Sequence, residues 1–448
     1  MNRLRRLAPD LTPLRRYPPY RRLWMGVTVS VIGSQLTAVA VQIQVYDLTH
    51  SSFAVGLAGL VAFVGLAGFG LYGGAIADAV DRRRLTLCTS SALALCSLAL
   101  ALYALTHHHA VWPLYLVVFL QAGLFGIDSP ARGAMLPRLL PTEVLPAANA
   151  LSQVGFNLGL TVGPVLAGGL VATVGFGAAY GVDAASFLVA VYAVWRLPPM
   201  PPARFVSAGA PPQRRPVGPS AVAEGLRFLR GQPVLLMSFL VDIDAMVFGM
   251  PRALFPALSR SFFHGGPATV GLLNAAPAIG ALTSAAVGGW VSRVRRQGVA
   301  VCVAIAVWGA AIAAFGFTRT LWLGMLALAV AGAADNVSAV FRSTILQVVT
   351  PDALRGRLQG VFIVVVSGGP RLGDLEAGAV AALSSPFFSV VSGGLACIAG
   401  VGLLAAAVPA FVRYDAARGA RRGVPWSESE ELSAAPELPG SPPGSPPG

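Results

Sequence analysis

About twelve long apolar runs divide this chain, and each is long enough to cross a bilayer as a helix. In lipid, a single segment can satisfy all its backbone polar groups only as a helix. Charged residues make up 11% of the chain, against roughly 25% in water-soluble domains. The sequence therefore predicts an all-α membrane protein of twelve transmembrane helices in two six-helix halves. The runs lie near residues 23–47, 52–77, 85–105, 111–130, 147–174, 177–197, 233–259, 268–291, 298–317, 321–341, 357–383 and 386–412.

The positive charge of the chain indicates its orientation. The net charge is +13, and every basic residue other than His is Arg. These arginines fall mainly in alternate gaps between apolar runs, whereas a nucleic-acid binder would gather them on a polar domain. With the N-terminus inside, only Arg260 and Arg319 fall in predicted outer loops. The positive-inside rule then predicts an even number of crossings and two cytoplasmic ends.

The longest gap between runs divides the chain midway. It is rich in Pro and Arg, a composition that cannot build a core and is typical of a linker. Segments of the first half also recur in the second at a nearly constant offset of about 207 residues, as in parallel transporter repeats. The predicted parts are a cytoplasmic N-terminal segment (1–22), two six-helix halves (23–197 and 233–412), a cytoplasmic linker (198–232) and a disordered cytoplasmic tail (413–448).

The segment GGAIADAVDRRR, residues 73–84, lies in the predicted inner gap between the second and third runs. It resembles motif A of the major facilitator superfamily, and the matching positions are Gly74, Asp78, Arg82 and Arg83. Asp81 belongs to the same predicted inner-gate segment but stands where many members of the superfamily have Gly. The resemblance implies an inner gate in which the Asp faces the N-terminus of a helix in the other half, here the helix near Arg355. The alternative is a plain topology signal from the arginines.

The segment GLTVGPVLAGG, residues 159–169, resembles motif C of the drug–proton antiporter branch, with Gly159, Gly163, Pro164 and Gly168 at matching positions. Small residues let two helices approach closely, and proline permits a kink. Motif C implies export, and the alternative is ordinary small-residue packing. Phe119 stands where the fourth helix of the family usually carries an Arg linked to proton coupling.

The segments IGSQLT (32–37), QVYDLTHSS (44–52), DSPARGAMLP (128–137) and FNLGLTVGP (156–164) resemble the siderophore (enterobactin) exporter branch and its macrolide-efflux relatives. The resemblance covers residues 20–412. It implies efflux across the cell inner membrane, as siderophore export or multidrug resistance.

Ionisable residues inside the apolar runs are candidates for proton coupling, because charge at that depth is costly. Asp242 lies about ten residues into the seventh run, near the bilayer midplane, and is the first candidate. Asp374 and Glu376 in the eleventh run are the others, although Asp374 could instead form an ion pair with Arg371. Asp242 could equally be a structural carboxylate. Asp128 and Arg132, at a predicted inner helix end, are expected to tie the inner gate.

Gln35, Gln44 and Tyr46 in the first run are candidates for the substrate cavity, and helix–helix hydrogen bonding is the alternative. No cofactor or metal site is expected: His107, His108 and His109 are adjacent in a predicted outer loop, and a site needs ligands that converge. The expected partners are a small-molecule substrate, protons and the bilayer, and the chain is expected to act as a monomer.

These features predict a secondary transporter that exports a small molecule by alternating access and proton antiport. An importer of the same fold and a transporter-like sensor without net transport are the alternatives. An enzyme is not expected, because no nucleophile has a His partner and no His lies inside a spanning run. An ATP-driven pump is not expected either, because no phosphate-binding loop is present.

Overall fold

The computed structural model describes residues 10–106, 109–201, 227, 229–289, 294–350 and 352–415. Within these ranges, the side chains of residues 71–72, 74–75, 77–78 and 352–364 are not described. Eleven of the described helical segments are long and apolar enough to cross a membrane, and α14 adds a helix of 32 residues. The prediction of an all-α membrane fold is confirmed.

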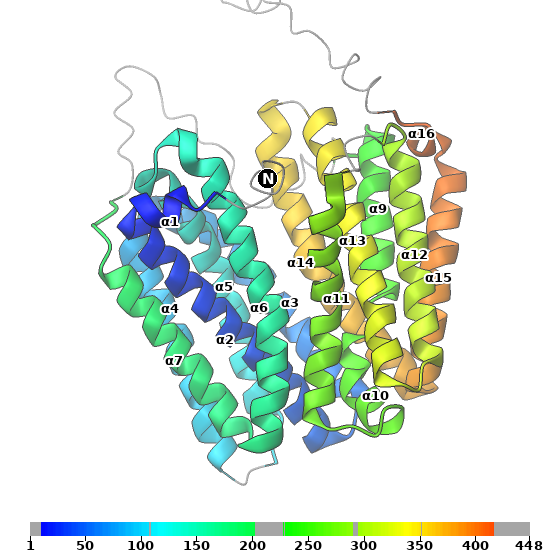
Figure 1. The fold of residues 1–448 in the computed structure, drawn as a ribbon, viewed down its shortest axis with the longest axis horizontal. Coiled ribbons are helices and arrows are strands. Elements are labelled where there is room, and N and C mark those ends of the chain that lie inside the picture. The colour runs from blue at the N-terminus through cyan, green and yellow to red at the C-terminus, as the bar shows by residue number, and fades with distance from the viewer. Residues whose placement is uncertain are drawn as a thin grey trace, which may run out of the picture.

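The helices form two groups, which lie side by side in Figure 1. The N-terminal group comprises α1 (Thr12–Arg16), α2 (Pro18–Thr49), α3 (Ser52–Ala79), α4 (Arg82–Leu105), α5 (Trp112–Leu139), η2 (Thr142–Val144), α6 (Leu145–Thr173) and α7 (Phe176–Trp195). The C-terminal group comprises α9 (Pro233–Phe248), η3 (Arg252–Leu254), α10 (Phe255–Ser261), α11 (Pro267–Val287), α12 (Gln297–Phe317), α13 (Leu321–Val349), α14 (Asp352–Leu383), α15 (Pro386–Ala407) and α16 (Pro409–Val412).

The same helix pairings recur in both groups. In the N-terminal group, α2 packs on α6, α3 on α5 and α4 on α7. In the C-terminal group, α9 packs on α14, α11 on α13 and α12 on α15. This recurrence is the three-dimensional counterpart of the sequence repeat.

Two helix pairs join the groups, α3 with α14 and α6 with α11. We name the two ends of the molecule after α1 and α10, which lie at its top and bottom in Figure 1. Close contacts at glycines join the groups on the side of the α10 end. A methyl group at Gly168 would lie 2.7 Å from the carbonyl oxygen of Pro267, and one at Gly56 would lie 2.4 Å from that of Asp374.

Two expected spans prove longer, and one is broken. The fourth and tenth spans were expected to end at residues 130 and 341, but α5 continues to Leu139 and α13 to Val349. A helix does not need to end where polar residues begin, provided that those residues find partners inside the protein. The seventh span stops at Phe248 and resumes at Arg252, because Pro251 has no N–H to donate to a continuous helix.

Helices α11 and α13 pack closely at Gly280, and a larger side chain there would test how close this packing is. A methyl group at this position would lie 1.8 Å from the carbonyl oxygen of Ala329, so Gly280→Ala is expected to force the two helices apart. Such overpacking costs about 1–3 kcal/mol. Thermal unfolding in mild detergent should show a lower midpoint. The control is Gly181→Ala, which meets no atom within 4 Å and should be neutral or stabilise the helix by about 0.5–1 kcal/mol. Equal midpoints for the two variants would contradict this packing.

Candidate functional site

A cavity of about 180 Å³ lies between the two groups of helices. Its wall comes from α2, α6, α11, α12, α13 and the interruption between α9 and η3. The polar residues on it are Gln35, Gln42, Arg252, Asn274 and Asp335, and Trp308 adds an indole ring. A concave space with a few convergent polar groups, at the interface of two repeats, is where this architecture binds its substrate.

The interruption of the seventh span is stabilised by side chains from neighbouring helices. The indole N–H of Trp308 donates to the carbonyl oxygen of Gly249 at 3.1 Å. The backbone N–H of Ala253 donates to Oδ1 of Asp374 at 3.1 Å. Irregular backbone at membrane depth requires such partners. The interruption places Arg252 on the cavity wall.

An ion cluster lies behind the cavity in the C-terminal group. Arg342 of α13 forms a salt bridge with Asp242 of α9, and both side chains are only 3% exposed. Arg342 also donates from Nε to Ser338 Oγ at 3.1 Å, and its Nη2 lies 3.5 Å from Oδ1 of Asp335. Asp335 is the member of the cluster that lines the cavity, with a side chain that is 33% exposed. The structure therefore places Asp242 in a buried ion pair, away from the cavity.

The other acids of the C-terminal group have different surroundings. Asp374 accepts the N–H of Ala253, and no salt bridge joins it to Arg371, whose Nη1 instead donates to the carbonyl oxygen of Ser367 at 2.6 Å. The expected Arg371–Asp374 ion pair is thus not formed. Glu376 is half-buried and has neither a hydrogen bond nor an ion pair with any described residue.

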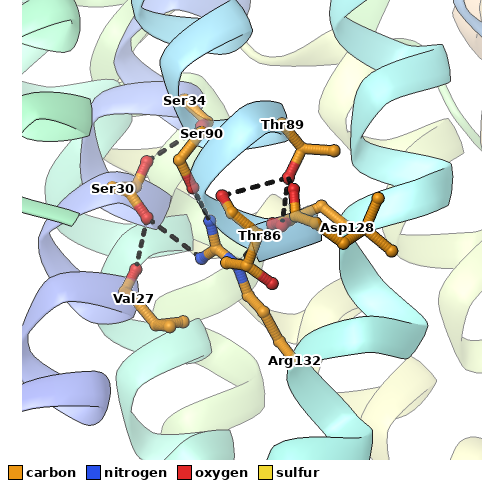
Figure 2. Close-up of polar contacts among 9 residues, drawn as sticks. Val27, Ser30, Ser34, Thr86, Thr89, Ser90, Asp128 and Arg132 are labelled. Atoms are coloured by element: carbon orange, nitrogen blue, oxygen red, sulfur yellow. Dashed lines mark hydrogen bonds and ion pairs between the residues drawn. The ribbon is translucent and has the colours of Figure 1, made fainter. Parts of the chain in front are cut away.

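A polar network ties α2, α4 and α5 together in the N-terminal group (Figure 2). Asp128 and Arg132, one turn apart on α5, form a salt bridge. Asp128 also accepts a hydrogen bond from Thr89 at 2.6 Å, and Arg132 donates to Ser90 at 3.2 Å and to Ser30 at 3.4 Å. This network lies within one group of helices, so Asp128 and Arg132 here hold three helices together.

A second buried carboxylate joins α2, α4 and α7. Asp183 is fully buried and accepts hydrogen bonds from Thr37 at 2.7 Å and from Ser97 at 2.6 Å. A methyl group at Gly33 would lie 2.4 Å from its Oδ1. Asp183 therefore acts as a hydrogen-bond acceptor between closely packed helices.

Of the three α2 residues predicted to line the substrate cavity, one does so in the structure. Gln35 lines the cavity. Gln44 is buried and accepts a hydrogen bond from the Tyr180 hydroxyl at 2.6 Å, away from the cavity wall. Tyr46 lies toward the α10 end, where the guanidinium of Arg260 stands 5.2 Å from its ring centroid. Gln44 follows Gln35 by two and a half helical turns and therefore points to the opposite side of α2, whereas Tyr46 lies on the side of Gln35 but about 16 Å further along the helix.

The motif A segment binds the end of α7. Asp81 caps α4 by accepting the N–H of Arg84 at 3.1 Å, and its other oxygen accepts the N–H of Met200 at 3.0 Å. Arg83 donates to the last carbonyl groups of α7, at Val194 and Trp195, and Arg82 donates to the carbonyl oxygen of Ala134 at 3.1 Å. Gly74 lies in α3, but its surroundings and the Asp78 side chain are not described, and neither are the side chains at the start of α14, so the expected contact of Asp78 with that helix stays a prediction.

The motif C glycines serve two interfaces. Gly159 and Gly163 face α2, where added methyl groups would lie 2.4 Å from Val31 Cγ1 and 2.7 Å from Gln35 Cβ. Pro164 and Gly168 face α11 across the interface between the groups, and Pro164 also lines the cavity. The segment thus packs α6 on its own group and on the other one.

An ion pair joins the groups at the α10 end. Arg260 of α10 forms a salt bridge with Asp47 of α2. Both side chains are partly exposed, and pairs of this kind contribute about 0–1 kcal/mol. The pair can therefore bias a conformational equilibrium without locking it.

No group of three or more His, Cys, Asp or Glu residues that could hold a metal ion occurs within the described part of the chain. His107 and His108 lie outside that part.

Comparison with known proteins places this architecture in a family. The family model of the major facilitator superfamily described as transmembrane secretion effector matches residues 8–429. The chain belongs to this family. Transmembrane secretion effectors of this superfamily are secondary transporters and not enzymes, so this chain is a multi-pass membrane transporter. The resemblance drawn from its motifs is confirmed.

Individual relatives agree with this assignment. The enterobactin exporter EntS of Citrobacter koseri is 30% identical over 403 residues, which cover 88% of this chain and 92% of that protein. The enterobactin exporter EntS of Shigella boydii is 29% identical over 393 residues, which cover 86% and 90%.

Among solved structures, the nucleoside transporter NupG superposes with a TM-score of 0.64 at 16% identity, covering 88% of this chain and 99% of that one. A D-xylose–proton symporter superposes with a TM-score of 0.66 at 12% identity, covering 87% and 97%. At these identities the structures show a shared fold.

The sequence analysis predicted no functional role for three charged residues at or behind the cavity, Arg252, Asp335 and Arg342. A signal existed for two of them, since Arg252 and Asp335 lie inside predicted spans, where charge is rare. The repeat offset also aligns Asp335 with Asp128. Arg342 was assigned to an inner loop because the tenth span was expected to end one residue earlier.

The Asp242–Arg342 pair predicts an asymmetric response to mutation. Arg342→Leu leaves the Asp242 carboxylate buried without its ion pair, and breaking a buried pair from one side costs about 3–5 kcal/mol. The unfolding midpoint in detergent should fall sharply. The double variant Arg342→Leu with Asp242→Asn removes both charges and should recover much of the loss. A double variant no more stable than the single one would contradict the pairing.

The Asp47–Arg260 pair predicts a change in conformational equilibrium. Arg260→Gln should raise the ratio of molecules open at the α10 end to molecules closed there by up to about fivefold. Spin–spin distances between labels on α2 and α10, in a cysteine-free background, would measure that ratio. Arg319→Gln is the matched control, since Arg319 stacks on Phe262 within the C-terminal group. A similar change in both variants would show that the ion pair has no special part in closure.

Proposed function

We propose that this transporter exports a small amphipathic molecule, of the siderophore or drug type, across the cytoplasmic membrane in exchange for protons. The observation that carries the proposal is the cavity between the two repeats, with Asp335 on its wall and the Arg342–Asp242 pair behind it. A carboxylate that faces the cavity can meet substrate and protons in turn. Relatives at about 30% identity that are enterobactin exporters support the direction of transport.

Orientation is part of the proposal. With the α1 end in the cytoplasm, the arginine-rich segments lie inside, as the positive-inside rule requires. The groups are held together on the side of the α10 end by the glycine contacts of α3 with α14 and of α6 with α11. A molecule closed toward the outside is the state in which an exporter takes up substrate from the cytoplasm.

Proton coupling is assigned to Asp335 ahead of the candidates proposed from sequence. Asp242 already has a cationic partner within contact distance, and Asp374 caps the resumed helix through Ala253. Glu376 has a free carboxylate but is absent from the cavity wall. Asp335 combines access to the cavity with a single long contact to Arg342.

Transport in proteoliposomes tests this function. In vesicles with an acidic lumen, the wild type should accumulate at least one member of a panel of siderophores and amphipathic drugs, zwitterions among them, against its concentration gradient. Protons should leave the lumen as that molecule enters. Asp335→Asn should abolish accumulation, because the amide cannot carry a proton between the two sides. Asp10→Asn, at an exposed carboxylate before α1, is the control and should transport like the wild type.

The outcomes separate the alternatives. Normal proton-driven accumulation by Asp335→Asn would assign coupling to another acid, and Glu376→Gln would be the next variant. Accumulation in the opposite direction would indicate an importer. Binding without any transport would indicate a transporter-like sensor.

A further inference from the structure

The cavity wall carries two opposite charges that do not neutralise each other directly. Arg252 and Asp335 both line the cavity. No salt bridge or hydrogen bond joins them, and Arg252 has neither kind of contact with any described residue. Each influences the other only at longer range. Two charged side chains therefore face one space between the repeats with donor and acceptor capacity to spare.

Neighbouring charges do not use up this capacity. Arg342 lies within salt-bridge contact of Asp242, and only its Nη2 approaches Asp335, at 3.5 Å. Asp374, which also acts on Arg252 electrostatically, gives one oxygen to the N–H of Ala253. A guanidinium has five N–H donors and a carboxylate has four acceptor positions, so both Arg252 and Asp335 can bind further groups.

The remaining wall is suited to an organic body. It combines the amides of Gln35, Gln42 and Asn274 with the indole of Trp308 and the small apolar side chains of α2 and α11. The amides can hydrogen-bond either charge of a ligand, and the small apolar side chains offer it an apolar surface, behind which the Trp308 indole is only 3% exposed. The wall therefore accommodates an apolar body beside the two charged groups.

We infer that Arg252 and Asp335 form a two-charge subsite for an amphipathic zwitterion, with the anionic group of the ligand on Arg252 and its ammonium group on Asp335. The inference rests on the proposed function, since it names the class of molecule that the same cavity takes. A monoanion would leave Asp335 facing its negative charge, and a monocation would leave Arg252 facing its positive charge. Only a zwitterion gives Arg252 a partner of opposite sign and at the same time gives Asp335 a second one, besides its 3.5 Å contact with Arg342.

This subsite is consistent with antiport. The ammonium group needs Asp335 in its ionised form, so a proton on Asp335 and a bound zwitterion exclude each other. The charged groups that act on Asp335 are Arg342 on its own helix, Asp242 on α9 and Arg252 at η3. Mutual exclusion of substrate and proton is what an exchanger requires.

Three probes with the same indole body test the inference by equilibrium binding to the purified protein in detergent. Tryptophan is a zwitterion, tryptamine a cation and indole-3-propionate an anion. The wild type should bind tryptophan about tenfold more tightly than either of the other two. Arg252→Gln should lower tryptophan affinity to that of tryptamine, and Asp335→Asn should lower it to that of indole-3-propionate.

Matched variants keep the test sharp. Arg252→Lys and Asp335→Glu retain the charges and should retain the preference for tryptophan, which a merely structural role would not require. Arg413→Gln, at an exposed arginine after α16, and Asp10→Asn should leave the order unchanged. Equal binding of the three probes, or binding of none of them, would overturn the inference.

The readout is independent of transport. A preference for tryptophan in a protein that fails to exchange protons would sustain the subsite and refute the antiport mechanism. Proton-driven transport by a protein that does not prefer tryptophan would sustain the antiport mechanism and refute the subsite.

Discussion

The structure depends on the rule that a polar or charged group inside a membrane must find a partner within the protein. Each described cluster follows it. Asp128 is paired with Arg132, Asp242 with Arg342, and Asp183 with the hydroxyl groups of Thr37 and Ser97. Since lipid offers no hydrogen bonds, these pairs direct particular helix faces inward and determine which helices are neighbours. Arg252 has no such partner among the described residues, and Asp335 has only the 3.5 Å contact with Arg342. Both of them lie on the wall of a cavity between the repeats.

A second constraint governs how the two groups meet. Lipid tails are as apolar as leucine, so helices associate through close backbone packing rather than through hydrophobic burial. Glycines provide this packing along α6, first against α2 and then against α11 in the other group. One helix thus belongs to its own group and to the interface, and contacts at that interface can be exchanged when the groups move. The partly exposed Asp47–Arg260 pair adds an interaction that is weak enough to break in each cycle.

Much of the fold could be predicted from the sequence, because bilayer thickness determines the length of a spanning run. The starts of the predicted runs match those of α3, α11 and α13 to within one residue. The predicted helix ends were wrong where the first polar residues after an apolar run were interpreted as the end of the helix. The polar residues that follow position 128 on α5 remain helical because Thr89, Ser90 and Ser30 supply partners from other helices. The proline at position 251 is a sequence signal for a helix interruption. The position of Arg252 on the cavity wall has no such signal, because it depends on contacts of the interruption with Trp308 and Asp374 from distant parts of the chain.

The candidate site, like the fold, was only partly predictable from the sequence. Charge within an apolar run drew attention to Asp242, Asp374 and Glu376, yet hydropathy cannot tell a carboxylate that is paired from one that faces a cavity. Asp242 is paired and Asp335 faces the cavity because Arg342 of α13 forms a close salt bridge with Asp242 and lies 3.5 Å from Asp335. The sequence by itself determined that this is a helical membrane transporter of a known superfamily, because hydropathy and local motifs act over short stretches of chain. Only the tertiary structure decided which charges are neutralised and which remain available to a substrate, because each pairing joins residues from different helices.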